Sequence, residues 1–213
     1  MPRVPWWALV SSVAAPLLLI GGWTVAAAAQ PVHFDSVVRT ISDLAARDTP
    51  HRWVMTIALV CVGVSHLVTA CGLGPAAATG RLLLGLAGLA TLGVAALPLP
   101  AAGASSSAHT AAATVSFVSL AVWPAFAWTR RQASGPTAET LLAPRVCAAA
   151  TAALLLGLAW FFVERLASGE MLGLAERVAA GSQALWPLAV VLSVRRAQAQ
   201  AHAQAHAQAQ AQI

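Results

Sequence analysis

Long runs of apolar residues, separated by short polar segments, dominate the sequence. A helix that crosses the hydrocarbon core of a bilayer needs about 20 predominantly apolar residues. Six runs approach this length, and almost every charged residue lies between them. The pattern predicts an all-α bundle of six transmembrane helices, at about residues 6–29, 53–73, 82–100, 110–128, 146–162 and 178–194.

The composition agrees with a protein that lies mostly in lipid. Hydrophobic residues make up 59% and charged residues 9% of the chain, whereas soluble domains carry about 25% charged residues. The charges are too few to cover a water-exposed surface. All basic residues are scattered Arg, and the Cys lie in apolar runs without metal or disulfide spacing. We therefore expect no nucleic-acid partner, no metal and no cofactor.

The two ends of the chain carry separate signals. The first run, at about residues 6–29, follows Arg3 and ends in an Ala-rich stretch, which is also the pattern of a secretory signal peptide. The run exceeds the roughly 7–15 residues of a signal-peptide core, so we favour a retained helix and keep the signal peptide as the alternative. Residues 197–213 alternate Ala with Gln or His. We expect a membrane domain at 1–196, followed by a low-complexity tail that is disordered or a frayed helix.

The placement of Arg predicts the orientation of the bundle. With six spans, both termini lie on the same side, and cytoplasmic segments usually hold the larger number of basic residues. The larger set shares the side of the termini: Arg3, Arg81, Arg130, Arg131, Arg145, Arg195 and Arg196. The opposite set consists of Arg39, Arg47, Arg52, Arg165 and Arg177. We expect a multi-pass protein of the plasma membrane with both termini in the cytoplasm.

Acidic residues gather on the side opposite the termini, which is the outer side in this orientation. Every acid except Glu139 lies there, together with three His. Ionisable groups at membrane depth tend to face the bundle interior and to pair there, so a site is expected at this face. The residues are Asp35, Asp43, Asp48, Glu164, Glu170, Glu176, His33, His51 and His109.

The first outer loop contains apolar residues at helical spacing. We expect a short amphipathic helix at Ser36–Arg47, capped by Asp35 or Ser36, that lies on the membrane surface or over the bundle. Arg39 and Asp43 lie four residues apart on its polar side and can form an ion pair. An exposed pair contributes less than about 1 kcal/mol, so for these charges taken alone we favour a solvated face.

Charged groups from several segments are expected to meet beneath this helix. Glu164 follows the aromatic end of the fifth span, Arg177 opens the sixth, and His109 opens the fourth. Together with Asp43 and Arg39 they predict an outward-facing, ligand-binding pocket. Ion pairing that fixes helix ends would explain the same positions without a ligand.

Other imidazoles raise the question of a cofactor or a metal. His66 lies deep in the second span, but no other span has a His at its middle, so we expect hydrogen bonding in the bundle rather than haem ligation. Ser105 and His109 have the i, i+4 spacing of hydroxyl and imidazole groups in some membrane hydrolases. His202 and His206 belong to the low-complexity tail and supply only two ligands, so we expect no zinc site.

Three features together resemble a known family. The first outer loop carries the run Thr-Ile-Ser-Asp-Leu at residues 40–44, and His109 opens the fourth span. The run Gly-Leu-Ala-Glu-Arg at 173–177 precedes a last span that contains Trp186. This pattern is similar to the domain of unknown function 998 family, which consists of six-helix membrane proteins of bacteria and archaea. The resemblance extends over about residues 6–196.

The resemblance implies the six-helix topology and adds Ser42 to the candidate site. It also draws attention to Asp43, His109 and Arg177. The family has no established activity, so the resemblance implies no reaction. Ala45 stands where such proteins commonly have Gly.

Three functions are compatible with these features. The first is binding of a lipid or small amphiphile in the outward-facing pocket, which makes that ligand and the bilayer the expected partners. The second is a lipid-modifying enzyme in which Asp43 or Glu164 is the acid or base and His109 transfers protons. The third is a proton- or solute-coupled transporter, which is least favoured because only His66 lies near the membrane midplane. The pattern indicates no oligomeric state.

Overall fold

The computed structural model describes residues 3–129 and 140–210. Within these ranges the chain is helical and contains no strand. Six helices are long and apolar enough to cross a membrane, which confirms the expected six-span fold class. They are α1 (Trp6–Ala28), α3 (Trp53–Gly72), α4 (Ala78–Ala96), α5 (Ser107–Ala127), α6 (Pro144–Ala167) and α7 (Leu172–Gln210).

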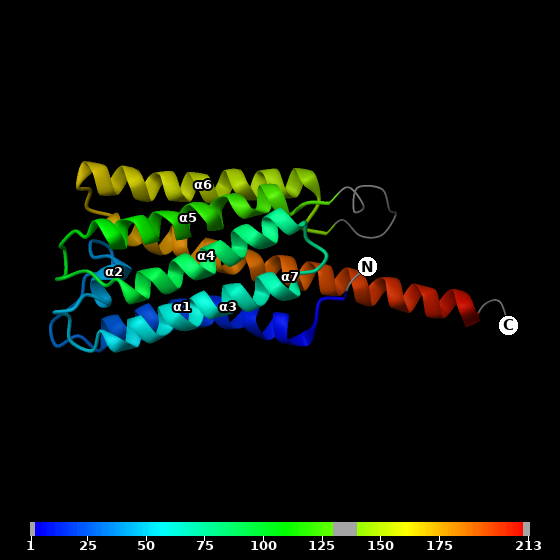
Figure 1. Ribbon diagram of the computed structural model, residues 1–213, viewed down its shortest axis with the longest axis horizontal. Coiled ribbons are helices and arrows are strands. Elements are labelled where there is room, and N and C mark those ends of the chain that lie inside the picture. Colours follow the sequence, from blue (N-terminus) through cyan, green and yellow to red (C-terminus); the bar gives the residue numbers. More distant parts are fainter. Residues whose placement is uncertain (1–2, 130–139, 211–213) are drawn as a thin grey trace.

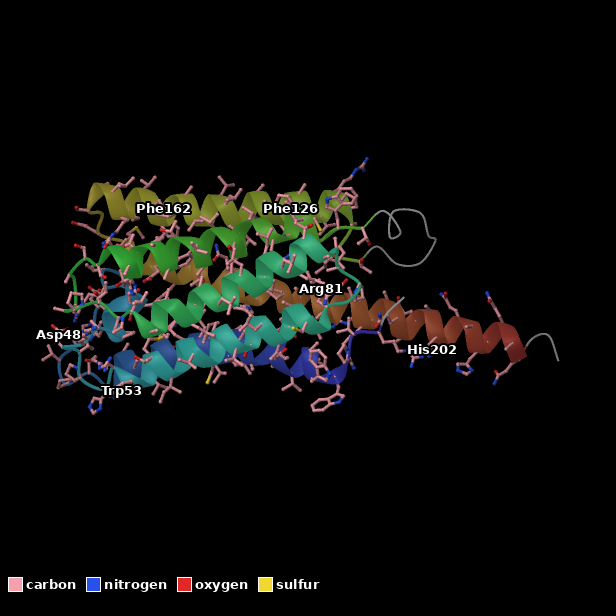
Figure 2. The ribbon with its side chains drawn as sticks, viewed as in Figure 1. Asp48, Trp53, Arg81, Phe126, Phe162 and His202 are labelled. Carbon is pink, nitrogen blue, oxygen red and sulfur yellow. The ribbon has the colours of Figure 1, made fainter. Side chains whose placement is uncertain are left out.

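Figure 1 shows the long helices side by side, with both chain ends at one end of the bundle and α2 (Ile41–Leu44) at the other. Each long helix packs on the next one in sequence, and contact between α1 and α7 closes the ring. We call the two ends the α2 end and the terminal end. Asp48 and Trp53 lie at the α2 end and Arg81 at the terminal end, as Figure 2 shows. Arg130, Arg131 and Glu139 lie outside the described residues.

Small and hydroxyl-bearing residues allow the helices to pack closely. A Cβ atom on Gly63 of α3 would lie 2.8 Å from the carbonyl oxygen of Gly88 on α4, so the two backbones meet only because both positions lack a side chain. The hydroxyl oxygens of Thr91 on α4 and Ser116 on α5 are 2.8 Å apart. Close backbone contact and hydroxyl pairs are typical of helices associated in a bilayer.

The segment before α1 contacts α7 at the terminal end. The N–H of Val4 donates to Oε1 of Gln198 at 3.2 Å, and Nη1 of Arg195 donates to the carbonyl of Val4 at 3.0 Å. Beyond these contacts α7 continues as an exposed helix to Gln210. Residues 197–210 are therefore helical and continuous with α7.

Several helix boundaries differ from the predicted spans because charged residues lie inside the helices. α4 begins at Ala78 rather than near residue 82, since Nε and Nη2 of Arg81 donate to the carbonyls of Ala70 and Cys71 at the end of α3. It ends at Ala96, shortly before Pro98, which cannot continue the hydrogen-bond pattern.

At the α2 end, α6 extends to Ala167 and α7 begins at Leu172. These helices therefore include Glu164, Glu176 and Arg177, which the hydropathy pattern placed outside the spans. The charged side chains are tolerated because they bond loop backbone at the end of the bundle.

The expected amphipathic helix at Ser36–Arg47 is much shorter than predicted. Oδ1 of Asp35 accepts from the N–H groups of Val37 and Val38 at 2.9 and 3.3 Å and holds a separate turn. A second N-cap then starts α2, which consists of four residues only. The apolar spacing in this loop therefore belongs to two successive turns.

Candidate functional site

The single turn of α2 is closed by a capping box. Oγ1 of Thr40 accepts from the N–H of Asp43 at 3.1 Å, and Oδ2 of Asp43 accepts from the N–H of Thr40 at 2.9 Å. Each side chain thus satisfies a backbone donor that the start of a helix leaves free. Oδ1 of Asp43 also accepts from the N–H of Gly103 at 2.8 Å, so this buried carboxylate ties α2 to the α4–α5 loop.

Two adjacent charged residues of α7 bind the same loop. The buried carboxylate of Glu176 accepts a hydrogen bond from the N–H of Ile41. Nη1 of Arg177 donates to the carbonyl oxygens of Ser36 and Arg39, both at 2.8 Å. The partners of both side chains are backbone groups and not oppositely charged side chains. These hydrogen bonds therefore take the place of the ion pairs that the sequence indicated.

Gly173 allows this contact between loop and helix. A Cβ atom at this position would lie 2.7 Å from the carbonyl oxygen of Ser36 and would overlap that of Arg39. The next residue, Leu174, donates its N–H to the carbonyl of Val37 at 2.9 Å. The first turn of α7 therefore lies directly against the backbone of the loop.

The expected Arg39–Asp43 ion pair is replaced by other contacts. The guanidinium of Arg39 lies 4.5 Å from the ring centroid of Phe34, which is a cation–π contact. Both carboxylate oxygens of Asp43 accept from backbone N–H groups. The loop is thus organised by side chain–backbone bonds.

His109, in the first turn of α5, is held by two hydrogen bonds. Its Nδ1 lies 2.8 Å from the carbonyl oxygen of Leu97, a group left free where α4 ends before Pro98. A carbonyl oxygen only accepts, so Nδ1 carries the proton of the neutral imidazole and Nε2 is an acceptor. Oγ of Ser42 lies 3.0 Å from Nε2 and donates a hydrogen bond to it. Ser105, the i−4 hydroxyl considered above, is exposed.

A cavity of about 390 Å³ adjoins the Ser42–His109 pair, between α2, the α4–α5 loop, α5, α6 and α7. We call it the α2 cavity. Its lining contains polar and aromatic side chains, which we call its polar part and its aromatic part. The polar part consists of Arg39, Ser42, Asp43, His109, Arg165 and Glu176 together with Thr40, Thr110 and Thr114, and the aromatic part consists of Phe117, Phe161 and Phe162.

A family model described as "Protein of unknown function (DUF998)" matches residues 12–193. The chain belongs to this family. The resemblance inferred from residues 40–44, His109 and 173–177 is thereby confirmed. Membership and six apolar helices together identify the chain as an integral membrane protein. No curated protein and no solved structure matches it.

In this DUF998 protein the six predicted binding residues do not all meet at one point. Arg39, Ser42, Asp43 and His109 line the α2 cavity. Arg177 is instead occupied by the loop carbonyls, and two of its nitrogen atoms, Nε and Nη2, are buried without a partner among the described residues.

Glu164 lies apart from Asp43 and His109, the residues with which the sequence grouped it as an acid or base. Its Oε1 accepts from the indole N–H of Trp160 at 3.2 Å, and its Oε2 accepts from the N–H of Met171 at 3.1 Å. It holds the α6–α7 connection and does not line the α2 cavity. Sequence reasoning missed Glu176 as a lining residue, although it lies within the 173–177 run that carried the resemblance.

A second, smaller cavity of about 60 Å³ lies deeper in the bundle of this DUF998 protein. We call it the inner cavity. It is lined by His66 and Gln183, and it shares Ser42 and Glu176 with the α2 cavity. Both imidazole nitrogens of His66 and Oε1 of Gln183 are buried without a partner among the described residues. The hydrogen bonds expected for His66 are thus not formed within that part of the chain.

Residues 3–129 and 140–210 contain no group of three or more His, Cys, Asp or Glu side chains that could hold a metal ion. The α2 cavity presents hydroxyl, imidazole, carboxylate and guanidinium groups.

Proposed function

We propose that the protein binds an anionic lipid or related amphiphile in the α2 cavity. The observation that carries this proposal is that one cavity is lined both by polar side chains, its polar part, and by three Phe side chains of α5 and α6, its aromatic part. An amphiphile needs both kinds of surface next to each other, and a cavity of about 390 Å³ is within the usual size range of ligand pockets.

The aromatic part suits the apolar portion of such a ligand. The ring centroids of Phe117 on α5 and Phe161 on α6 are 5.4 Å apart, and those of Phe161 and Phe162 are 5.7 Å apart. They form a continuous apolar surface. α6 is also the least buried of the six long helices, so the helix that supplies two of the rings faces the surrounding lipid.

The charge of the polar part favours an anionic head group. Asp43 and Glu176 already accept backbone hydrogen bonds, so their acceptor capacity is partly used. Among the described residues, Arg165 lines the cavity and makes no hydrogen bond or ion pair, and the guanidinium of Arg39 contacts the face of Phe34. Arg side chains pair well with carboxylate and phosphate groups.

Hydrogen bonding does not favour the alternative in which Asp43 or Glu164 is the catalytic acid or base. Asp43 accepts from two backbone N–H groups, and Glu164 accepts from Trp160 and Met171 outside the cavity. A carboxylate whose oxygens accept hydrogen bonds in this way stabilises the fold and is less available for proton transfer.

Native mass spectrometry of the full chain, with phosphatidylglycerol and phosphatidylcholine added in equal amounts, tests the proposal. We expect preferential binding of phosphatidylglycerol, reduced at least about 10-fold by Arg165→Gln, because one charge-assisted contact contributes about 1.5–3 kcal/mol. Arg47→Gln is the matched control, since Arg47 is an exposed Arg near the same end that does not line the cavity. Equal binding of both lipids, or equal effects of both substitutions, would contradict the proposal.

A further inference from the structure

The Ser42–His109 pair has the geometry of a nucleophile and its general base. The Oγ–Nε2 distance of 3.0 Å is within hydrogen-bond reach, and the carbonyl of Leu97 holds the opposite nitrogen, Nδ1, at 2.8 Å. A hydroxyl bonded to an imidazole that a third group orients is the arrangement that activates serine in acyl transfer. A carbonyl here takes the orienting position that a carboxylate often occupies.

The position of the two groups relative to the cavities fits this role. Ser42 is half-buried and lines both the α2 cavity and the inner cavity, so its hydroxyl faces space that a ligand can enter. His109 is only 5% exposed, which shields the base from bulk water. A shielded base behind an accessible hydroxyl is the order that nucleophilic catalysis needs.

The hydrogen bonds around α2 fix the position of Ser42. The capping box binds Thr40 and Asp43 on either side of Ser42, and Glu176 binds the N–H of Ile41. Burying carboxylates is costly unless they are hydrogen-bonded. Here two buried carboxylates are used on one four-residue turn, and the side chain that this turn presents to both cavities is the Ser42 hydroxyl.

From this geometry we propose that Ser42 is a catalytic nucleophile and His109 its general base, acting on a carboxylic ester of an amphiphile bound in the α2 cavity. The proposal rests on the function proposed above, because the same cavity must hold the ester. It replaces Asp43 and Glu164, the acid–base candidates of the sequence, with a hydroxyl–imidazole pair.

The reaction balances without a further cofactor. Ser42 Oγ bonds to the ester carbonyl carbon while its proton moves to Nε2 of His109. The bond between that carbon and the alcohol oxygen then breaks, and Nε2 returns the proton to the departing alcohol. The acyl group is left on Ser42 as an ester. Water or a second alcohol next attacks it, gives its proton to Nε2, and the proton returns to Oγ as the acyl group leaves.

Charge in the cavity supports these steps. Negative charge develops on the carbonyl oxygen during each attack, and Arg39 and Arg165 are the cations among the described lining residues. The imidazolium formed in the same steps shares the cavity with Asp43, which attracts it, and with Arg165, which repels it. Opposite charges are thus available to both developing charges.

An alkyl fluorophosphonate tests the proposal, because it reacts irreversibly with an activated serine and carries an apolar chain. The full chain in lipid nanodiscs is incubated with the probe, and the modified peptide is located by mass spectrometry. We expect one adduct, on Ser42. His109→Gln should slow its formation at least about 100-fold, since general-base catalysis contributes about 10²–10⁴ in rate.

Ser105→Ala is the matched control, because Ser105 is the hydroxyl four residues before His109 and is exposed. It should leave labelling unchanged, whereas Ser42→Ala should abolish it. Peptide mapping in the unsubstituted protein decides the outcome even if a variant does not fold. No adduct on Ser42, or equal rates with His109→Gln, would overturn the proposal.

Lipid binding measured on the same samples separates the two proposals. If phosphatidylglycerol binds but Ser42 is not modified, the catalytic proposal fails and the binding function stands. If neither binding nor modification occurs, both fail. If Ser42 is modified and His109→Gln slows the reaction, the pair is catalytic.

Discussion

Glu176 and Ile41 lie 135 residues apart in the sequence, yet the carboxylate of Glu176 accepts the backbone N–H of Ile41. Ile41 is the first residue of α2, whose four residues form a single helical turn. A helix this short is not stable on its own, because nucleation fixes several residues for very few hydrogen bonds. The last long helix therefore supports the short one at its start.

Substitution of Glu176 tests this support. Glu176→Gln keeps an oxygen acceptor, so we expect the free energy of unfolding to change by less than about 1 kcal/mol. Glu176→Met has a similar size but leaves the Ile41 N–H buried without a partner, which should lower the free energy by about 1–3 kcal/mol. Thermal unfolding in detergent, followed by fluorescence of the eight Trp, measures both. Equal effects would show that the hydrogen bond does not stabilise the fold.

Contact between the loop and α7 predicts a penalty for any side chain at Gly173. Gly173→Ala would push a Cβ atom against the carbonyl oxygens of Ser36 and Arg39, and we expect a loss of about 1–3 kcal/mol in stability. Gly157→Ala on α6 is the control, since its Cβ would meet nothing closer than 4.0 Å. Alanine is favoured over glycine in a helix by about 1 kcal/mol, so Gly157→Ala should be neutral or stabilising. A reversed order of melting temperatures would rule out the close contact.

The unpartnered nitrogens of His66 predict a stabilising substitution. His66→Leu removes two buried polar atoms that lack a partner among the described residues, so we expect the melting temperature to rise. Thr69→Val on the same helix should lower it, because Oγ1 of Thr69 is 2.8 Å from Oγ of Ser11 on α1. The same Trp-fluorescence melts compare the two. A lower melting temperature for His66→Leu would indicate that the imidazole binds a molecule in the inner cavity.

The orientation in the membrane predicts a labelling pattern. Cys71 is exposed at the end of α3 near the terminal end, and Ser105 is exposed at the α2 end. With both termini in the cytoplasm, a membrane-impermeant maleimide should modify Ser105→Cys in intact cells and Cys71 only after the cells are opened. Each site is tested as the single Cys of the chain, with the other Cys residues replaced by Ala. Labelling of Cys71 in intact cells would indicate the opposite orientation.

Hydropathy alone located all six spans because the constraint is local. A segment that crosses lipid must be apolar over about 20 residues whatever its neighbours are. The exact ends were less predictable, since Arg81 and Glu176 are accommodated inside helices by contacts with other elements. Nothing in the residues around Arg81 indicates that its guanidinium reaches carbonyls at the end of α3.

The first loop shows the same limit. Its apolar spacing predicted one helix at Ser36–Arg47, and this extent was wrong because Asp35 and Thr40 cap two separate turns. The sequence contained both caps. It did not show that both would be used, because the two turns depend on Glu176 and Arg177 binding this loop from α7.

By itself the sequence determined that the chain spans the membrane six times and that its polar residues gather at one end, because hydrophobicity and charge act over whole segments. It also placed Ser42, Asp43 and His109 among the residues of interest. Only the tertiary structure decided that Ser42 faces His109 and that Glu164 lies away from the cavity that they line. A hydrogen bond forms within about 3 Å, and that distance depends on how separate helices rotate and pack against one another.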